Sequence, residues 1–368
     1  MVTNLKKKKT IFVVAGGTGG HLFPAKVVAE DLTAHKKFNV FFLSDKRGFL
    51  ACKPDQNTNL LPVWAKGFFG KNNIHKIISL FITGLGLLQS LYYILRYRPE
   101  QVIGFGGYTC VPVFFAALIL RKKIFIHEQN AQIGRTNKFF AKYADTVFYG
   151  LPLSTPIPRS IHLGNPVRKE ILSLSDLPYT SPHKDKKFHI LIMGGSMGAA
   201  FFATLLPKTI MHLSQKDQSR LHITFQCPQH HIDSVKERLN QSNISYDIAP
   251  FFVNISDYIK TSHFVISRAG ALSVTEMSIA GKPTLFIPYP YATDDHQAKN
   301  VRSVYVKDNK TGFSSCWMRR QNEVDFEWLT TFITNIMNDH KQLIFAAKKI
   351  KTFSVVYKRD VLEQKIMS

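Results

Sequence analysis

Short apolar runs alternate with longer stretches of mixed polarity along the first half of the chain. Five of these runs have the length of a buried strand, at residues 11–15, 40–43, 101–104, 123–127 and 146–149. The segments between them suit crossover helices. Alternation of this kind predicts a parallel sheet with helices on both of its faces.

The same pattern begins again after an irregular connection. Four prolines interrupt the chain between residues 152 and 166, and residues 173–187 are polar and rich in turn-forming side chains. Further strands are expected at residues 189–193, 222–226, 264–267 and 284–288. The sequence therefore predicts an α/β protein of two similar, doubly wound domains that face each other.

Residues 77–95 carry no charged side chain, and their number matches a marginal membrane span. Within them, Ser79, Thr83, Gly86 and Ser90 recur at intervals that place a small or polar stripe on one face of a helix. We expect an amphipathic or partly buried helix rather than a span. Its apolar face is available to lipid, and the basic residues on its flanks would then face acidic headgroups.

Composition narrows the class of protein. Hydrophobic residues make up 45% and charged residues 20% of the chain, which excludes a disordered protein. The four cysteines are far apart and form no C-x-x-C pair, so a reducing compartment fits best. The net charge of +23 calls for an anionic partner: nucleic acid, a membrane face or a phosphorylated substrate. Residues 10–15 are too short for a secretory signal core.

Glycine-rich turns follow the first strand of each half. The first reads GGTGGH at residues 16–21 and the second GGSMG at residues 194–198. The spacing of the first fits neither the dinucleotide fingerprint nor the P-loop. Glycine lets a ligand approach the backbone, so we interpret both turns as ligand sites rather than packing turns. In the second, the backbone amides and the Ser196 hydroxyl would hold an anion.

Two groups of polar residues in the first half have candidate chemistry. His21 is expected near a helix N-terminus, where positive potential disfavours the imidazolium, so a neutral imidazole could act as a general base. The alternative is a histidine bonded to its own backbone. Residues 127–130 place four polar side chains at the carboxyl end of a parallel strand, a position better suited to a cleft than to a core.

The second half contains residues suited to a nucleotide sugar. A helix is expected to begin near Ala271, with its free amides facing a phosphate, and Glu276 lies within two turns, in reach of a ribose diol. Gln297 and Asn300 share a helix face, and amide side chains suit sugar hydroxyls. Arg168, at the domain junction, could clamp a diphosphate or only pair with a carboxylate.

Together these segments resemble the MurG family, the UDP-N-acetylglucosamine transferases that glycosylate undecaprenyl-diphospho-muramoylpentapeptide in peptidoglycan synthesis. The matching stretches are GGTGGHLFPA (16–25), GFGGY (104–108), HEQNAQIGRTN (127–137), GNPVR (164–168), GGSMGA (194–199), SRAGALSVTE (267–276) and GKPTLFIPYPYATDDHQAKN (281–300). They follow one another in order along most of the chain, and together they are far more specific than any single glycine loop.

The resemblance implies a fold and a division of labour. We expect two Rossmann-like domains facing across a cleft, the GT-B type. Residues 1–165 would form the acceptor- and membrane-facing domain, joined by a C-terminal helix within residues 350–368. Residues 166–349 would bind UDP-GlcNAc. No cofactor and no metal site are implied, and the chain contains no D-x-D triplet.

It also implies roles for individual residues. On the acceptor side, the cleft would be lined by Thr18, Gly19, Gly20 and Asn130. The diphosphate would be contacted by Arg168 and Ser196, and the phosphate-facing helix start would be formed by Ala271, Leu272 and Ser273. Glu276 would hold the ribose, Gln297 and Asn300 would read the GlcNAc hydroxyls, and Phe252 would take the uracil-side position.

The expected reaction is a direct displacement at the anomeric carbon with inversion. The MurNAc 4-hydroxyl attacks and UDP leaves. His21 is the preferred base and Glu128 the second candidate. Oriented amides and Arg168 would stabilise the charge that develops on the diphosphate.

A lipid-linked acceptor gives the positive charge an explanation. We expect peripheral association with an anionic membrane surface, at the cytoplasmic face of the bacterial inner membrane, and contacts with cell-wall synthesis proteins as a further possibility. Nucleic acid is not expected, because the basic residues are scattered and no stacked aromatic module is evident. Two alternatives remain: a related GT-B enzyme with another lipid acceptor, and a non-catalytic basic membrane-binding protein.

Overall fold

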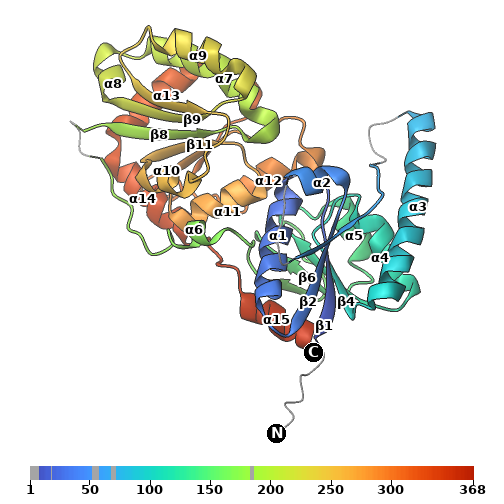
Figure 1. Ribbon diagram of the computed structural model, residues 1–368. Helices are drawn as coiled ribbons and strands as arrows, with labels where there is room; N and C mark the ends of the chain where they lie inside the picture. Colours follow the sequence, from blue (N-terminus) through green and yellow to red (C-terminus); the bar gives the residue numbers. More distant parts are fainter. Residues whose placement is uncertain (1–7, 18, 52–57, 68–71, 183–185) are drawn as a thin grey trace. The chain divides into compact units, whose positions relative to one another are not determined.

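The computed structural model describes residues 8–17, 19–51, 58–67, 72–182 and 186–368 (Figure 1). The chain divides into two compact units. Unit 1 comprises residues 1–168 and 356–368, and unit 2 comprises residues 169–355. Each unit has its own sheet and its own hydrophobic core.

Unit 1 is built on a parallel sheet of seven strands in the order β3-β2-β1-β4-β5-β6-β7. Its strands are β1 (Lys9–Val14), β2 (Phe38–Ser44), β3 (Asn59–Pro62), β4 (Gln101–Gly104), β5 (Lys123–Glu128), β6 (Thr146–Tyr149) and β7 (Ser160–His162). Its helices are α1 (Gly19–Ala34), α2 (Lys46–Ala51), α3 (Asn73–Tyr97), α4 (Cys110–Ile119), α5 (Arg135–Phe140) and α15 (Arg359–Met367). The strand order reverses direction between β1 and β4, and ligands bind at such switch points in doubly wound sheets.

The central strand β1 explains why its sequence is apolar without alternation. Ile11 and Val13 are fully buried in a cluster that also contains Leu362 and Ile366 of α15. Phe12 and Val14 are fully buried in a second cluster on the other face of the sheet, with residues of α3, α4 and α5. A strand covered on both faces reads as a continuous apolar run, as predicted.

Unit 2 repeats the architecture with six parallel strands in the order β10-β9-β8-β11-β12-β13. Its strands are β8 (Phe188–Met193), β9 (Leu221–Gln226), β10 (Ser245–Ala249), β11 (Phe264–Ser267), β12 (Thr284–Phe286) and β13 (Trp317–Met318). Its helices are α6 (Lys169–Leu172), α7 (Gly195–His212), α8 (Gln215–Arg220), α9 (Ile232–Leu239), α10 (Ile255–Thr261), α11 (Ala271–Ala280), α12 (His296–Arg302), α13 (Phe326–Asn338) and α14 (His340–Lys351).

Every strand predicted from the sequence is present, although the last, expected at residues 284–288, ends at Phe286. Four strands were not predicted: β3, β7, β10 and β13. These four are the edges of the two sheets. Their residues are mostly half-buried or exposed, so they lack the apolar pattern of the central strands.

Helix α3 has the predicted amphipathic character, but its small and polar face is buried and its apolar face is exposed. Its buried residues are the small and polar stripe Ser79, Thr83, Gly86 and Ser90, together with Ile94. Gly86 is required there, because a Cβ atom would lie 1.9 Å from the backbone oxygen of Trp64. The helix is long and apolar enough to cross a membrane, but it packs along α4 through this stripe and turns most of its apolar side chains outward.

Candidate active site

The carboxyl edge of the unit 1 sheet carries the first glycine turn and the predicted catalytic residues. Gly17 adopts a φ of 89°, which favours glycine. Gly19 and Gly20 open α1, and His21 lies in its first turn, as predicted. Thr18 lies outside the described residues.

His21 is held from two directions. Its Nδ1 lies 2.9 Å from Oε1 of Gln129, and among the described residues this is the only hydrogen bond of the ring. The imidazole edge also lies beside a turn made by Gly106 and Gly107, at φ 95° and 81°, where Cβ atoms would come within 3.4 and 3.6 Å of the ring. The ring is thus hydrogen-bonded to a side chain distant in sequence and not to its own backbone. Its Nε2 makes no hydrogen bond to the described residues.

Glu128 is almost fully buried at the end of β5, and both of its carboxylate oxygens are occupied. Oε1 accepts hydrogen bonds from the backbone N–H and the side-chain amide of Asn130, both at 3.0 Å. Oε2 accepts from the backbone N–H of Gly134 at 2.9 Å and from Nδ2 of Asn137 at 2.8 Å. The carboxylate therefore braces the turn between β5 and α5, and it brings Asn130 to the same edge as His21.

The unit 2 phosphate site is only partly described. Ser196 lies within α7, but its side chain is outside the described part of the chain. Helix α11 begins at Ala271, as predicted, after Gly270, whose extended backbone offers no side-chain cap. Leu272 and Ser273 are partly exposed in the first turn, and Glu276 follows one turn later, also partly exposed. The first N–H groups of a helix attract anions.

Gln297 and Asn300 share a face of α12, as predicted, but both contact backbone. Gln297 Oε1 accepts hydrogen bonds from the N–H groups of Ala269, at 3.2 Å, and Tyr289, at 2.8 Å. Asn300 is fully buried and donates from Nδ2 to the carbonyl of Ala269 at 3.1 Å. These bonds tie the loops after β11 and β12 together, so the sugar-reading role of both residues stays a prediction.

The remaining predicted residues, Arg168 and Phe252, lie in loops. Arg168 is the last residue of the first part of unit 1 and is partly exposed. The Phe252 ring packs 4.5 Å from the Tyr258 ring and is 8% exposed, whereas its neighbours Phe251 and Val253 are 61% and 80% exposed. Its uracil-side role stays a prediction.

Arg268 was missed by the sequence analysis, although it directly follows strand β11. It is 5% exposed, and it donates from Nη1 to the carbonyl of Ile287 at 3.1 Å and from Nη2 to Oε1 of Gln321 at 2.7 Å. Its guanidinium also lies 5.1 Å from the rings of Phe201 and Phe202. Burial lowers the pKa of Arg268 to about 10. The signal available in the sequence was an arginine placed directly after a buried strand. In the structure, the hydrogen bonds of Arg268 fix the loops around α11.

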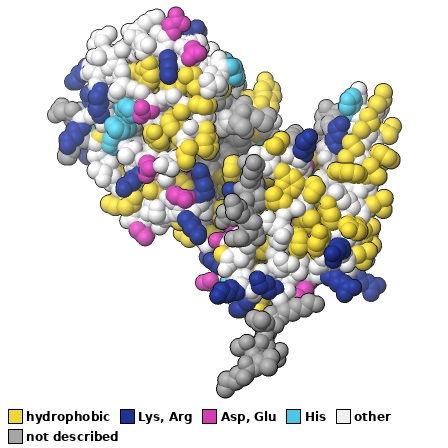
Figure 2. All heavy atoms as spheres, viewed as in Figure 1, with side chains coloured by type: hydrophobic (Ala, Val, Ile, Leu, Met, Phe, Trp, Pro, Cys, Tyr) yellow, Lys and Arg dark blue, Asp and Glu magenta, His cyan; other side chains and the backbone are white. Residues whose placement is uncertain are grey.

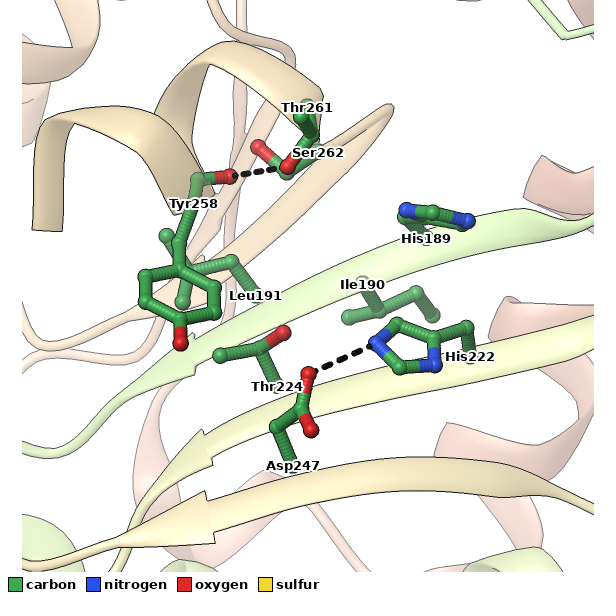
Figure 3. A pocket seen from close by; sticks show the side chains of 9 residues that line it. All are labelled: His189, Ile190, Leu191, His222, Thr224, Asp247, Tyr258, Thr261 and Ser262. Atoms are coloured by element: carbon green, nitrogen blue, oxygen red, sulfur yellow. Dashed lines mark hydrogen bonds and ion pairs between the residues drawn. The ribbon is translucent and has the colours of Figure 1, made fainter. Parts of the chain in front are cut away.

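One pocket of unit 2, with a volume of about 210 Å³, contains none of the predicted site residues (Figure 3). It lies over the first half of β8 and the middle of β9 and β10, where His222 Nε2 and Asp247 Oδ2 form an ion pair at 3.2 Å. Ligands of doubly wound sheets bind outside the carboxyl ends of the strands, so we place the active site at that edge and not in this pocket. Among the residues that the structure describes, no cluster of three or more His, Cys, Asp or Glu side chains could hold a metal ion.

Both halves of the chain match family models. The glycosyltransferase family 28 N-terminal domain matches residues 11–149, and the family 28 C-terminal domain matches residues 189–361. A relative from Bartonella quintana is named UDP-N-acetylglucosamine–N-acetylmuramyl-(pentapeptide) pyrophosphoryl-undecaprenol N-acetylglucosamine transferase. It is 37% identical over 298 residues, 80% of this chain and 78% of the relative. A relative of the same name from Rickettsia bellii is 34% identical over 348 residues, 93% of this chain and 94% of the relative.

Solved structures give the same picture. MurG of Acinetobacter baumannii is similar with a TM-score of 0.77 and 27% identity, covering 98% of this chain and 99% of that one. A UDP-GlcNAc 2-epimerase from Neisseria meningitidis bound to UDP-GlcNAc is similar with a TM-score of 0.63, covering 97% of this chain and 99% of that one. At 13% identity, the second likeness concerns the fold alone.

Proposed function

The chain belongs to the MurG family within glycosyltransferase family 28, and we propose that it transfers N-acetylglucosamine from UDP-GlcNAc to undecaprenyl-diphospho-MurNAc-pentapeptide. Its two parallel-sheet units have the GT-B fold that the sequence predicted. The proposal rests mainly on the similarity to N-acetylglucosamine transferases such as that of Rickettsia bellii, which extends over 93% of this chain and 94% of the relative. The transfer forms peptidoglycan's disaccharide-linked lipid intermediate.

The acceptor hydroxyl needs a base, and His21 is better placed for this than Glu128. In the proposed step the MurNAc 4-oxygen bonds to the anomeric carbon, the bond to UDP breaks, and the hydroxyl proton passes to His21 Nε2. That nitrogen makes no hydrogen bond to the described residues. Both oxygens of Glu128 already accept two hydrogen bonds each. To take the proton, Glu128 would have to break some of the hydrogen bonds that hold the turn between β5 and α5.

We place the donor on unit 2. The diphosphate gains negative charge as UDP leaves, and the first amides of α11 are pre-oriented donors at a positive helix end. Ser196 would add a hydroxyl to the same diphosphate, and a contact from Arg168 stays a prediction. Glu276 would hold the ribose. Inversion at the anomeric carbon follows from a single displacement.

The decisive experiment follows UDP release from UDP-GlcNAc with and without the lipid-linked acceptor. We expect release only when the acceptor is present. His21→Ala should lower kcat by on the order of 10²- to 10⁴-fold and leave the Kd for UDP-GlcNAc nearly unchanged. His230→Ala, at an exposed histidine of unit 2, is the matched control. Absence of acceptor-dependent release from folded protein, with no calorimetric heat from UDP, would overturn the proposal.

We further propose that unit 1 docks peripherally on an anionic membrane at the cytoplasmic face of the bacterial inner membrane. Phe81, Leu88 and Leu95 of α3 are 67%, 63% and 62% exposed. Figure 2 shows apolar side chains gathered along this helix, with lysines and arginines near its ends. Apolar side chains would enter the lipid, and the basic ones would meet headgroup phosphates.

Lying on the membrane suits α3 better than crossing it. The stripe of Ser79, Thr83 and Ser90 is buried against the rest of unit 1, and Ser90 donates to the carbonyl of Gly86 at 2.6 Å. A spanning helix would have to leave α4 and the core cluster that contains Ile94. Binding to proteins of cell-wall synthesis stays a prediction.

A further inference from the structure

Three side chains of unit 1 form a continuous hydrogen-bonded chain that starts at His21. His21 Nδ1 lies 2.9 Å from Gln129 Oε1. Gln129 Nε2 lies 3.1 Å from His127 Nδ1, and His127 Nε2 lies 3.0 Å from the carbonyl oxygen of Gly164. Gln129 and His127 are each 1% exposed, so water does not compete for these bonds.

Two backbone carbonyls fix the direction of every bond in this chain. The Gly164 oxygen can only accept, so His127 must carry a proton on Nε2. The His127 carbonyl lies 2.8 Å from one end of the Gln129 amide, so that end is the nitrogen and the end facing His21 is the oxygen. The amide orientation is therefore set by chemistry at both ends.

The charge of His127 determines which of its ring nitrogens carries a proton. Burial lowers the pKa of His127 to about 4, so the ring is neutral at physiological pH. With its single proton on Nε2, its Nδ1 offers a lone pair to the second N–H of Gln129. The Gln129 oxygen can then only accept, and His21 must donate to it from Nδ1. A neutral His21 consequently has no proton on Nε2.

We propose that Gln129 and His127 are positioning residues that fix the tautomer of His21, so that Nε2 presents its lone pair to the acceptor hydroxyl. This inference rests on the proposed role of His21 as the base. When the hydroxyl proton moves to Nε2, His21 becomes an imidazolium whose Nδ1–H still donates to Gln129. The amide cannot take that proton, so the positive charge stays on His21 until Nε2 releases the proton to solvent.

An amide at this position has a different consequence from the carboxylate of a Ser-His-Asp triad. A carboxylate would stabilise the imidazolium and favour protonation of His21 before the acceptor arrives. Gln129 orients the ring without adding a negative charge. The hydrogen-bonded chain thus selects the tautomer of His21 without placing a carboxylate beside the ring.

The first test is the tautomer itself, in the unaltered protein without substrate. Long-range ¹H–¹⁵N correlation spectra of histidine-labelled protein distinguish Nδ1–H from Nε2–H rings, and loss of one set of signals in His21→Ala assigns His21. We expect His21 as the Nδ1–H form and His127 as the Nε2–H form. An Nε2–H form of His21, or an even mixture, overturns the inference whatever the activity of the enzyme.

The second test removes the amide and measures turnover. Gln129→Met keeps the length of the side chain but cannot accept from His21. We expect a mixture of His21 tautomers and a kcat lower by on the order of 10²-fold, with the KM for UDP-GlcNAc unchanged. Gln342→Met is the control: Gln342 is also a buried glutamine but lies in unit 2, so this variant should alter neither the His21 signals nor kcat.

The two tests separate the inference from the proposed function. If the unaltered enzyme transfers no sugar but shows the expected tautomers, the proposed function fails and the hydrogen-bonded chain stands as structure. If transfer occurs and Gln129→Met changes kcat and KM no more than Gln342→Met does, the inference fails and the function stands.

Discussion

Arg320 holds Asp295 through two parallel hydrogen bonds, from Nη1 to Oδ1 at 2.8 Å and from Nη2 to Oδ2 at 2.7 Å. Asp295 and the preceding Asp294 both have a φ of 54°, in the left-handed region of backbone conformation that residues other than glycine rarely adopt. Such a conformation persists only where its surroundings hold it. The Arg320 fork therefore fixes the turn that leads into α12, two residues before Gln297.

We expect Arg320→Lys to loosen this turn, because lysine keeps the charge but cannot make the fork. The pair is about two-fifths exposed, so its loss should cost about 1 kcal/mol, or roughly a fivefold higher KM for UDP-GlcNAc. Steady-state kinetics should show a smaller change in kcat. Arg319→Lys, next to it in a surface pair with Glu323, is the control. Equal effects of the two variants would disprove a role for the Arg320 fork.

Glu128→Gln separates a structural carboxylate from a catalytic one. Asn137 can turn its amide to meet the new N–H₂ group, but the Gly134 N–H then loses its acceptor. Gly134 is exposed, so water can pair with the freed N–H, and the free energy of unfolding should fall by about 1 kcal/mol, the net contribution of one hydrogen bond. Hydrogen exchange in residues 128–137 should rise, as it should not in His21→Ala. Lost turnover with unchanged stability and exchange would instead make Glu128 the base.

The sequence predicted the turns at the carboxyl edge of each sheet, where we propose that the chemistry takes place, but not the contacts made there. Central strands such as β1 are buried on both faces, so their apolar runs predict them and the turns that follow. Asn300 shows the limit: its spacing from Gln297 was correct, yet only the fold reveals that it is buried against the Ala269 carbonyl. The bond from His21 to Gln129 joins residues 108 positions apart, and no local pattern indicates it.

Helix α3 shows a second limit of the same kind. Its small and polar stripe was visible in the sequence, and a stripe alone does not say which face meets the protein. The backbone oxygen of Trp64 against Gly86 decides it, because only a side chain as small as hydrogen fits there. The large apolar residues are therefore left outside, and this reverses the usual order of a surface helix.

Membrane docking can be tested on that outward face. Phe81→Ser with Leu88→Ser removes two side chains that are 67% and 63% exposed, so the fold should be unaffected. Burying such a side chain in lipid stabilises binding by about 1.5–3 kcal/mol, so the double variant should bind anionic vesicles on the order of 10²-fold more weakly or worse. Vesicle sedimentation measures this, with Ile344→Ser in unit 2, at a partly exposed apolar residue, as the control.

Salt distinguishes the two contributions to this binding. Headgroup attraction is screened as ionic strength rises, whereas apolar insertion is not. The unaltered protein should bind anionic vesicles less at high salt but keep a residual fraction, and the double variant should lose nearly all of its binding. Unchanged sedimentation of the double variant would show that α3 is not the docking surface.

Acid should destabilise unit 2 through His263. Burial, with smaller contributions from the nearby His189 and Lys282, lowers its pKa to about 4, whereas an unfolded histidine titrates near 6.5. Between these values the unfolded state binds more protons, so the free energy of unfolding falls as pH drops from 6.5 towards 4 and is unaffected above 6.5. Because the ring is partly open to solvent, we expect about 1 kcal/mol of loss between pH 7.5 and 5 from this group.

His263→Asn isolates that contribution. The asparagine oxygen can replace Nδ1 as acceptor for the His189 N–H, which lies 2.9 Å away, but it does not titrate. Urea unfolding followed by tryptophan fluorescence reports on this region, because Trp317 packs against Phe264 at 5.4 Å between ring centres. Stability of the variant should depend less on pH than that of the unaltered protein, while His230→Asn should behave like the latter. A variant that loses as much stability in acid as the unaltered protein would show that His263 is already charged in the folded state.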